Sequence, residues 1–142
     1  MKKISGLLLI TLLILSFCSV SYAASAPPLS QVGIAEIYSS QGGTEEIYSS
    51  TKLCTDKDHG GNPFYIVTYE IGYSRYGSRI AKLNGVRLKE VQSQPIDLDN
   101  DRIIDGWFRW WDASGFTGGN FTYEATSENY PWNTMSVDIR IR

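Results

Sequence analysis

Four aspartates fall within nine residues of this chain, in the segment from Asp97 to Asp105. Their carboxylates repel one another unless they are solvated or neutralised, and Ca²⁺ takes several oxygen ligands of the kind that a turning loop of aspartates supplies. The loop departs from an EF-hand, because Arg102 stands where such loops have Gly and Phe108 where they have Glu. The spacing predicts either a looser calcium loop or a solvated acidic turn, and the candidate ligands are Asp97, Asp99, Asp101 and Asp105.

An aromatic segment follows at residues 106–112. In a strand, Trp107, Arg109 and Trp111 share one face, and Phe108 and Trp110 share the other. Either the strand is covered on both faces by core or interface packing, or one face is exposed and binds a ligand. Exposed aromatic rings beside polar groups suit sugar rings or peptides. The candidate ligand-binding residues are Trp107, Trp110, Trp111 and Trp132.

Cys54 lies five residues before His59, the only histidine of the chain. A thiolate–imidazole pair oriented by Asp56 or Asp58 would suit nucleophilic catalysis. The same aspartates and His59 could instead ligate a metal, or Cys54 could simply pack near a turn. The sequence favours a non-catalytic protein, with Cys54 and His59 as the candidates if it is an enzyme.

The elements that must position these residues are strands. From Gln31 onward the apolar residues recur with period two more often than with helical period. The last segment is the clearest, because Met135, Val137, Ile139 and Ile141 alternate with polar residues. We therefore expect an all-β fold with little helix, a single antiparallel β-sandwich or open barrel, with the Trp107–Trp111 strand in the middle.

Two local patterns indicate hairpins. Asn84-Gly85 is typical of a type I′ turn, which would set Lys82 opposite Arg87. The pentapeptide beginning at Glu36 recurs at Glu46, which indicates either two strands of one hairpin or a coincidence.

The N-terminus predicts export. Lys2 and Lys3 precede an apolar stretch from Ile4 to Phe17, and Ser21-Tyr22-Ala23 offers small residues to a signal peptidase. The predicted organisation is a signal peptide over residues 1–23, a flexible leader over 24–30 and a single β domain over 31–142. Only Cys54 would remain after cleavage, so the exported domain would be secreted without an intramolecular disulfide.

The balance of charged residues argues against some classes of partner. After cleavage the chain would keep 11 basic and 15 acidic residues, with no basic run of the kind that binds phosphates. We expect no nucleic-acid partner and, once the signal is removed, no membrane span.

Several short motifs follow one another in the order seen in a known family. They are Gly42-Gly43-Thr44-Glu45-Glu46-Ile47, Asp58-His59-Gly60-Gly61, Glu70-Ile71-Gly72-Tyr73, Leu83-Asn84-Gly85, Trp111-Asp112-Ala113-Ser114-Gly115 and Pro131-Trp132-Asn133-Thr134-Met135-Ser136. With the signal peptide, this pattern resembles the YolA-like small exported proteins of Gram-positive bacteria and their phages, a domain of unknown function. The resemblance implies export and a single domain, and it carries no catalytic residue.

These observations predict a secreted bacterial binding module, stabilised by Ca²⁺ if the acidic loop is a site, that recognises carbohydrate, a cell surface or a protein. The alternatives are a secreted inhibitor or effector acting through a protein interface, and a small thiol-dependent enzyme using Cys54 and His59.

Overall fold

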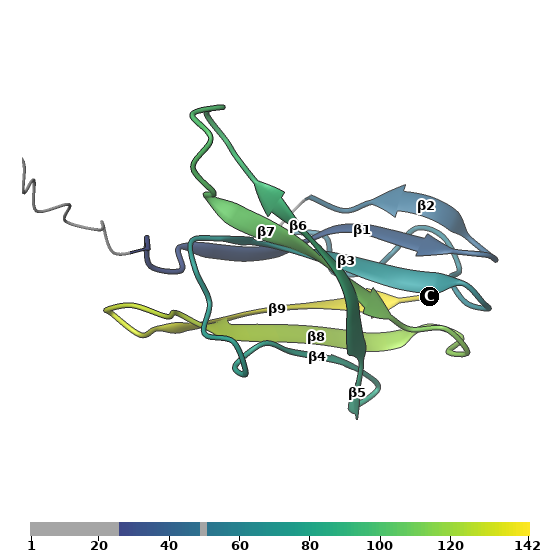
Figure 1. The fold of residues 1–142 in the computed structure, drawn as a ribbon. Coiled ribbons are helices and arrows are strands. Elements are labelled where there is room, and N and C mark those ends of the chain that lie inside the picture. Colours follow the sequence, from purple (N-terminus) through teal and green to yellow (C-terminus); the bar gives the residue numbers. More distant parts are fainter. Residues whose placement is uncertain (1–25, 49–50) are drawn as a thin grey trace, which may run out of the picture.

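The fold is a sandwich of two antiparallel sheets (Figure 1). The computed structural model describes residues 26–48 and 51–142, and no helix occurs among them. The all-β prediction is therefore confirmed, and the two sheets stay separate rather than closing into a barrel. The larger sheet has the order β2-β1-β3-β7-β6 and the smaller one β5-β4-β8-β9. The strands are β1 (Gln31–Ser39), β2 (Gly43–Glu46), β3 (Phe64–Ile71), β4 (Ile80–Leu83), β5 (Val86–Arg87), β6 (Lys89–Ile96), β7 (Gly106–Asp112), β8 (Gly119–Thr126) and β9 (Thr134–Ile141).

The core lies between the inner faces of the two sheets. On β9 the predicted alternation is confirmed: Ile139 and Ile141 are buried, and Met135 and Val137 pack partly buried against the same core. Burying each large apolar side chain contributes about 1.5–3 kcal/mol. The largest fully buried apolar side chains of this core are Tyr123, Phe64, Phe121, Ile37, Ile66, Leu83 and Ile139.

Both predicted hairpins form. Lys82 pairs with Arg87 around a turn in which Asn84 and Gly85 have φ of 53° and 82°, as a type I′ turn requires. Glu36 pairs with Glu46 across β1 and β2, so a hairpin forms here, although only the first residue of the second pentapeptide lies in β2. The aromatic strand β7 lies between β3 and β6, inside the sheet as expected.

The described residues that precede β1 contact the smaller sheet and its connections. Leu29 is 3% exposed, and its N–H donates to Ser127 Oγ at 3.0 Å. The Asn129 side chain donates to the carbonyl of Ala26. Ser127 and Asn129 belong to the turn between β8 and β9. Ile141 pairs with Gly119, which lies at the other end of β8. The described chain thus enters and leaves the sandwich at opposite ends (Figure 1).

Candidate functional site

The outer face of the five-stranded sheet carries a row of aromatic rings, which we call the aromatic face: Tyr38, Tyr65, Tyr69, Phe108 and Trp110. Tyr38 pairs with Tyr65, and Tyr69 pairs with Phe108. Rings from three adjoining strands are therefore brought to one surface. Tyr38 is 40% exposed and the other four are partly exposed. No element of the described residues forms a third layer over this face.

Alternation along β7 separates its tryptophans. Trp111 points inward, is 3% exposed and donates from Nε1 to Thr68 Oγ1 at 2.8 Å. Trp107 lies on the same inner side, where the Arg109 guanidinium is 5.6 Å from its ring centroid. Trp110 points outward, with its ring 6.4 Å from that of Phe108. On the inner side of β7, Trp111 thus packs in the core while Trp107 stays partly exposed, and Trp110 is the tryptophan of this strand that a ligand on the outer face could touch.

A groove of about 330 Å³ adjoins the aromatic face where β1 lacks a neighbour. Strand β2 pairs only with the part of β1 from Glu36 to Ser39, so the Gln31–Ile34 part faces β9 across the groove. The Tyr69 ring forms one wall. It lies over Gly33, where a Cβ atom would stand only 2.3 Å from ring carbons, and its hydroxyl accepts a hydrogen bond from Gln31 Nε2 at 2.8 Å.

The inner face of the same sheet holds a buried charged network around Glu70, which is 0% exposed. Arg109 Nε donates to Glu70 Oε1 at 3.0 Å and Arg109 Nη1 donates to Glu90 Oε1 at 2.9 Å. The Tyr123 hydroxyl donates to Glu70 as well. Burial, reinforced by the Glu70 carboxylate, raises the pKa of Tyr123, so this hydroxyl stays protonated. Because Glu70, Arg109 and Tyr123 are buried and paired with one another, the centre of the network has a structural role.

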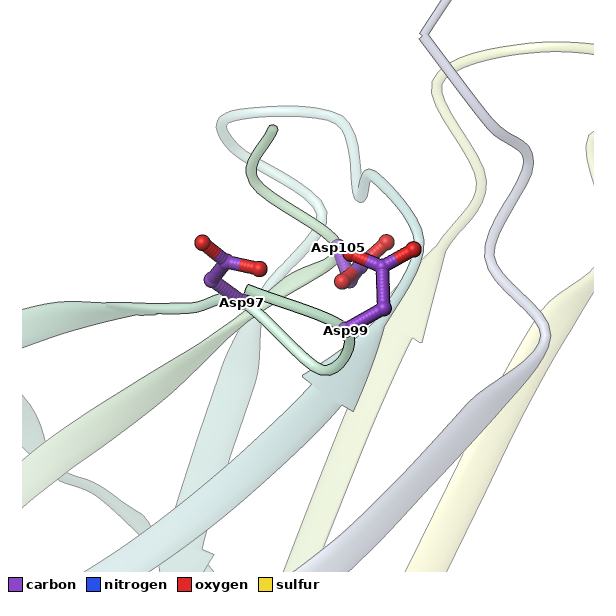
Figure 2. Close-up of side chains that lie close together, drawn as sticks. All are labelled: Asp97, Asp99 and Asp105. Atoms are coloured by element: carbon purple, nitrogen blue, oxygen red, sulfur yellow. The ribbon is translucent and has the colours of Figure 1, made fainter. Parts of the chain in front are cut away.

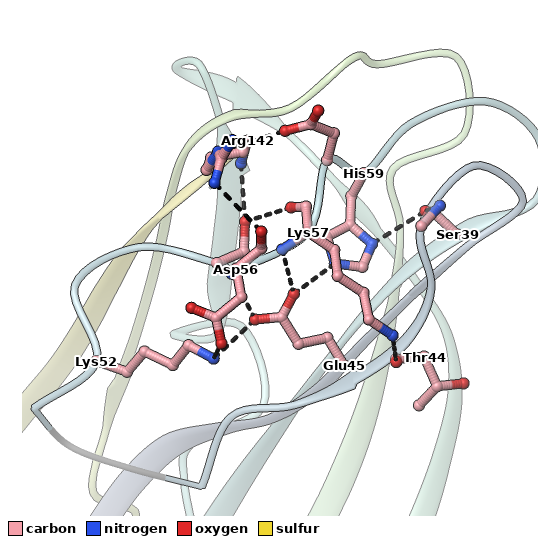
Figure 3. A network of polar contacts seen from close by, with 11 residues as sticks. Ser39, Thr44, Glu45, Lys52, Asp56, Lys57, His59 and Arg142 are labelled. Carbon is pink, nitrogen blue, oxygen red and sulfur yellow. Dashed lines mark hydrogen bonds and ion pairs between the residues drawn. The ribbon is translucent and has the colours of Figure 1, made fainter.

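A second buried network surrounds His59, which is 1% exposed (Figure 3). Its Nδ1 lies 3.0 Å from Ser39 Oγ, and its Nε2 lies 3.1 Å from Glu45 Oε2. The residue types are those of a hydrolytic triad, but the two ring nitrogens are exchanged, since a triad serine faces Nε2 and its carboxylate faces Nδ1. The Ser39 hydroxyl is also enclosed, since the residue is 1% exposed and its Oγ already accepts the N–H of Gly42 at 2.8 Å. A substrate has no access to this oxygen.

Glu45 is the centre of that network. Burial alone would raise the pKa of its carboxyl, but hydrogen bonds from Lys52, from the N–H groups of Asp56 and Lys57, and from His59 outweigh it and lower the pKa to about 2. The sequence reading missed Ser39 and Glu45 as the partners of His59. The only indication in the sequence was the period-two alternation, which places Ile37, Ser39 and Glu45 on the inward side of their strands.

The predicted Cys54–His59 pair is not formed, because both ring nitrogens of His59 are engaged by Ser39 and Glu45. Cys54 is partly buried and sits in an isolated bridge beside Arg140 of β9. Asp56 binds Lys52 at 2.8 Å and Asp58 pairs with Arg142 at 3.3 Å. Neither aspartate orients the imidazole, so this segment serves to fasten the β2–β3 connection to β9.

The acidic loop between β6 and β7 brings three of its four aspartates together (Figure 2). One carboxylate oxygen from each of Asp97, Asp99 and Asp105 lies within 4.8 Å of the others. The fourth aspartate, Asp101, is not part of this cluster; like the other three it accepts a backbone N–H, that of Ile103 at 2.7 Å. Arg102 does adopt a left-handed conformation, with φ 72°, at the position where calcium loops carry Gly. The three convergent carboxylates could hold a hard divalent cation.

Trp132 lies apart from the aromatic face in the chain, on the turn between β8 and β9 of the smaller sheet. It is 57% exposed and Tyr130 is 75% exposed, and their rings meet edge to face at 5.4 Å. This pair is a second exposed aromatic surface.

The predicted signal peptide, residues 1–23, lies outside the described residues. Among residues 26–48 and 51–142, no helix is long and apolar enough to cross a membrane.

Comparison with known proteins identifies a family without assigning it chemistry. Neither the curated proteins nor the solved structures include a match to this chain. A family model described as a domain of unknown function, DUF4879, matches residues 24–141, a span that includes both sheets and every candidate residue discussed above. The chain therefore belongs to the DUF4879 family.

Proposed function

We propose that this chain is an exported, non-catalytic binding module that recognises carbohydrate at a cell surface through its aromatic face. The observation that carries the proposal is the row of partly exposed rings from Tyr38 to Trp110 on a sheet face without a covering layer. A third layer would normally cover so much aromatic surface in a stable domain.

The chemistry of the face suits sugars. Pyranose rings present apolar C–H faces that pack on aromatic rings, while hydroxyl groups need polar partners at the edges. Gln92 pairs with Trp110 and Gln94 pairs with Phe108 on the neighbouring strand β6, and Gln31 lies beside Tyr69. Amide side chains both donate and accept hydrogen bonds, so they match sugar hydroxyls without requiring a charge.

Catalysis is the weaker alternative, because the arrangement that most resembles an active site is closed. Ser39 and His59 are each 1% exposed, and the thiol of Cys54 lacks a free imidazole partner.

Secretion is the location that the predicted signal peptide supports. Membership of the YolA-like exported proteins is part of the same proposal, since it rests on the export signal and the motif order.

The test is a fluorescence titration with neutral oligosaccharides, using tetramers of N-acetylglucosamine and of glucose. Stacking on Trp110 should change tryptophan emission, and Trp110→Ala should abolish both the change and the binding seen by calorimetry. Trp132→Ala is the matched control, because it removes an exposed tryptophan from the other sheet. Loss of binding in Trp132→Ala alone would move the site to the β8–β9 turn, and absence of binding to both tetramers would contradict the proposal.

Ca²⁺ is proposed as a stabilising ion at Asp97, Asp99 and Asp105. An ion that binds only the folded state raises its stability by about 2.7 kcal/mol at a hundredfold excess over Kd. The melting temperature should therefore rise with Ca²⁺ and fall with EGTA, and the response should vanish in Asp99→Asn but persist in Asp101→Asn. A melting temperature that ignores Ca²⁺ would reject the ion.

A further inference from the structure

The corner of the aromatic face where Tyr48 lies beside Tyr69 differs from the rest of the face because it carries negative charge. Tyr48, which follows β2, is 59% exposed, and its ring centroid lies 6.2 Å from that of Tyr69 at an interplanar angle of 30°. Both rings line the groove between β1 and β9. Two tilted rings at the mouth of a groove form an aromatic corner in which a ligand group can sit against both π faces.

Two carboxylates accompany this corner. Glu36 and Glu46 lie directly opposite each other on β1 and β2, and like charges in that position destabilise a sheet. Within the described ranges, neither forms an ion pair with Lys, Arg or His. Burial, and then the negative charges of Glu36 and Glu46, raise the pKa of Tyr48, which is consistent with both carboxylates acting on its ring.

The one cation in the groove is already neutralised among the residues that the structure describes. Lys52 Nζ lies 2.7 Å from Glu45 Oε1 and 2.8 Å from Asp56 Oδ2. The remaining charged residue in the groove lining, Asp138 on β9, is exposed and negative. The corner therefore combines aromatic rings with uncompensated negative charge.

From this combination we infer that the Tyr48–Tyr69 corner is a subsite for the ammonium group of an amino sugar, so that the ligand is a glycan containing free glucosamine. Ammonium groups are attracted to the faces of aromatic rings, and Glu36 and Glu46 supply the complementary charge. A polyanionic polymer would be repelled by the same carboxylates. This inference rests on the proposed carbohydrate function, and it adds the class of sugar.

The test compares the tetramer of glucosamine with the tetramer of N-acetylglucosamine, in which the amine is acylated and uncharged. Wild-type protein should bind the glucosamine tetramer about tenfold more tightly, the value of one well-placed cation–π contact with charge assistance. Added salt should reduce this preference, because exposed charges are screened.

Variants separate the subsite from the rest of the face. Glu36→Gln combined with Glu46→Gln should remove the preference for glucosamine while leaving the affinity for the acetylated tetramer unchanged. Asp101→Asn, which removes one exposed carboxylate outside the corner, is the control and should keep the preference. Equal affinity of the wild type for both tetramers, or a preference that survives in the double variant, would overturn the inference and leave the carbohydrate function intact.

Two further outcomes are distinguishable. If neither tetramer binds and Trp110 emission does not change, the proposed function itself fails, and the subsite fails with it. If a lysine-rich peptide binds as tightly as the glucosamine tetramer and loses affinity in the double variant, the corner reads ammonium groups on proteins, and the assignment to a glycan is wrong.

Discussion

The two faces of the five-stranded sheet carry the same residue types in different environments. Glu45 and Glu46 are neighbours in sequence, as are Trp110 and Trp111. Glu45 and Trp111 point inward, where each polar atom has a partner. Glu46 and Trp110 point outward, where the carboxylate has no cation within the described chain and the ring remains partly exposed. Residue type alone therefore does not identify a binding residue. The two faces differ in whether neighbouring groups pair with the carboxylate and cover the ring.

The largest expected effect comes from breaking the inner charged network. Arg109→Met should destabilise the fold by about 3–5 kcal/mol, because it leaves the buried Glu70 carboxylate without its cation. Denaturant unfolding followed by fluorescence measures this loss.

The control is the double variant Arg109→Met with Glu70→Gln, which removes both charges. It should recover part of the lost stability, and a double variant less stable than the sum of its single changes would contradict the compensation argument.

Truncating the two neighbouring tryptophans compares the faces directly. Trp111→Ala should cost about 3–5 kcal/mol through the cavity that it leaves, whereas Trp110→Ala should cost about 1 kcal/mol. Chemical denaturation of both variants under one set of conditions gives the difference. Equal costs would mean that the outer ring is also part of the packed structure.

Acid should lower the stability of the fold by protonating Glu45 on the inner face. Because its pKa is lowered in the folded protein from 4.5 to about 2, its contribution is complete above about pH 4.5 and is lost as the pH falls towards 2. The loss should amount to about 2–3 kcal/mol, measured as the change in unfolding free energy with pH. Glu45→Gln should be less stable at neutral pH and should lack this part of the acid dependence.

The smallest effect has the opposite sign. Glu46→Gln should stabilise the protein by about 0.2–1 kcal/mol, since it relieves the repulsion between Glu36 and Glu46 across β1 and β2. Thermal unfolding at low salt is the sensitive measurement. A destabilised Glu46→Gln would show that this carboxylate, like Glu45, has a structural partner.

The sequence predicted the fold well because period-two alternation and turn chemistry are local. The Asn84-Gly85 turn and the inward face of β9 both depend on residues close together in the chain. The sequence does not show which side of β7 faces inward, because both of its faces are aromatic and only the position of β8 shows which one is covered.

The site was harder to predict because its members are distant in sequence. Tyr48 meets Tyr69, and Glu45 meets His59, only through sheet register and the β2–β3 connection. Proximity along the chain suggested Cys54, Asp56 and Asp58 as partners of His59, yet Asp56 binds Lys52 and Asp58 binds Arg142. The loop aspartates were more tractable, since three of the four converge within one turn.

The opposite placement of Ala26 and Ile141 bears on how domains of this kind could be joined in series. Ala26 lies beside the β8–β9 turn, while Ile141 ends next to Gly119 at the far end. Tandem copies joined head to tail would form an elongated rod in which the joints avoid the outer surface of the larger sheet. Such a rod would present its rings in series along one polymer, and linking weak modules in this way raises the effective concentration of each successive contact.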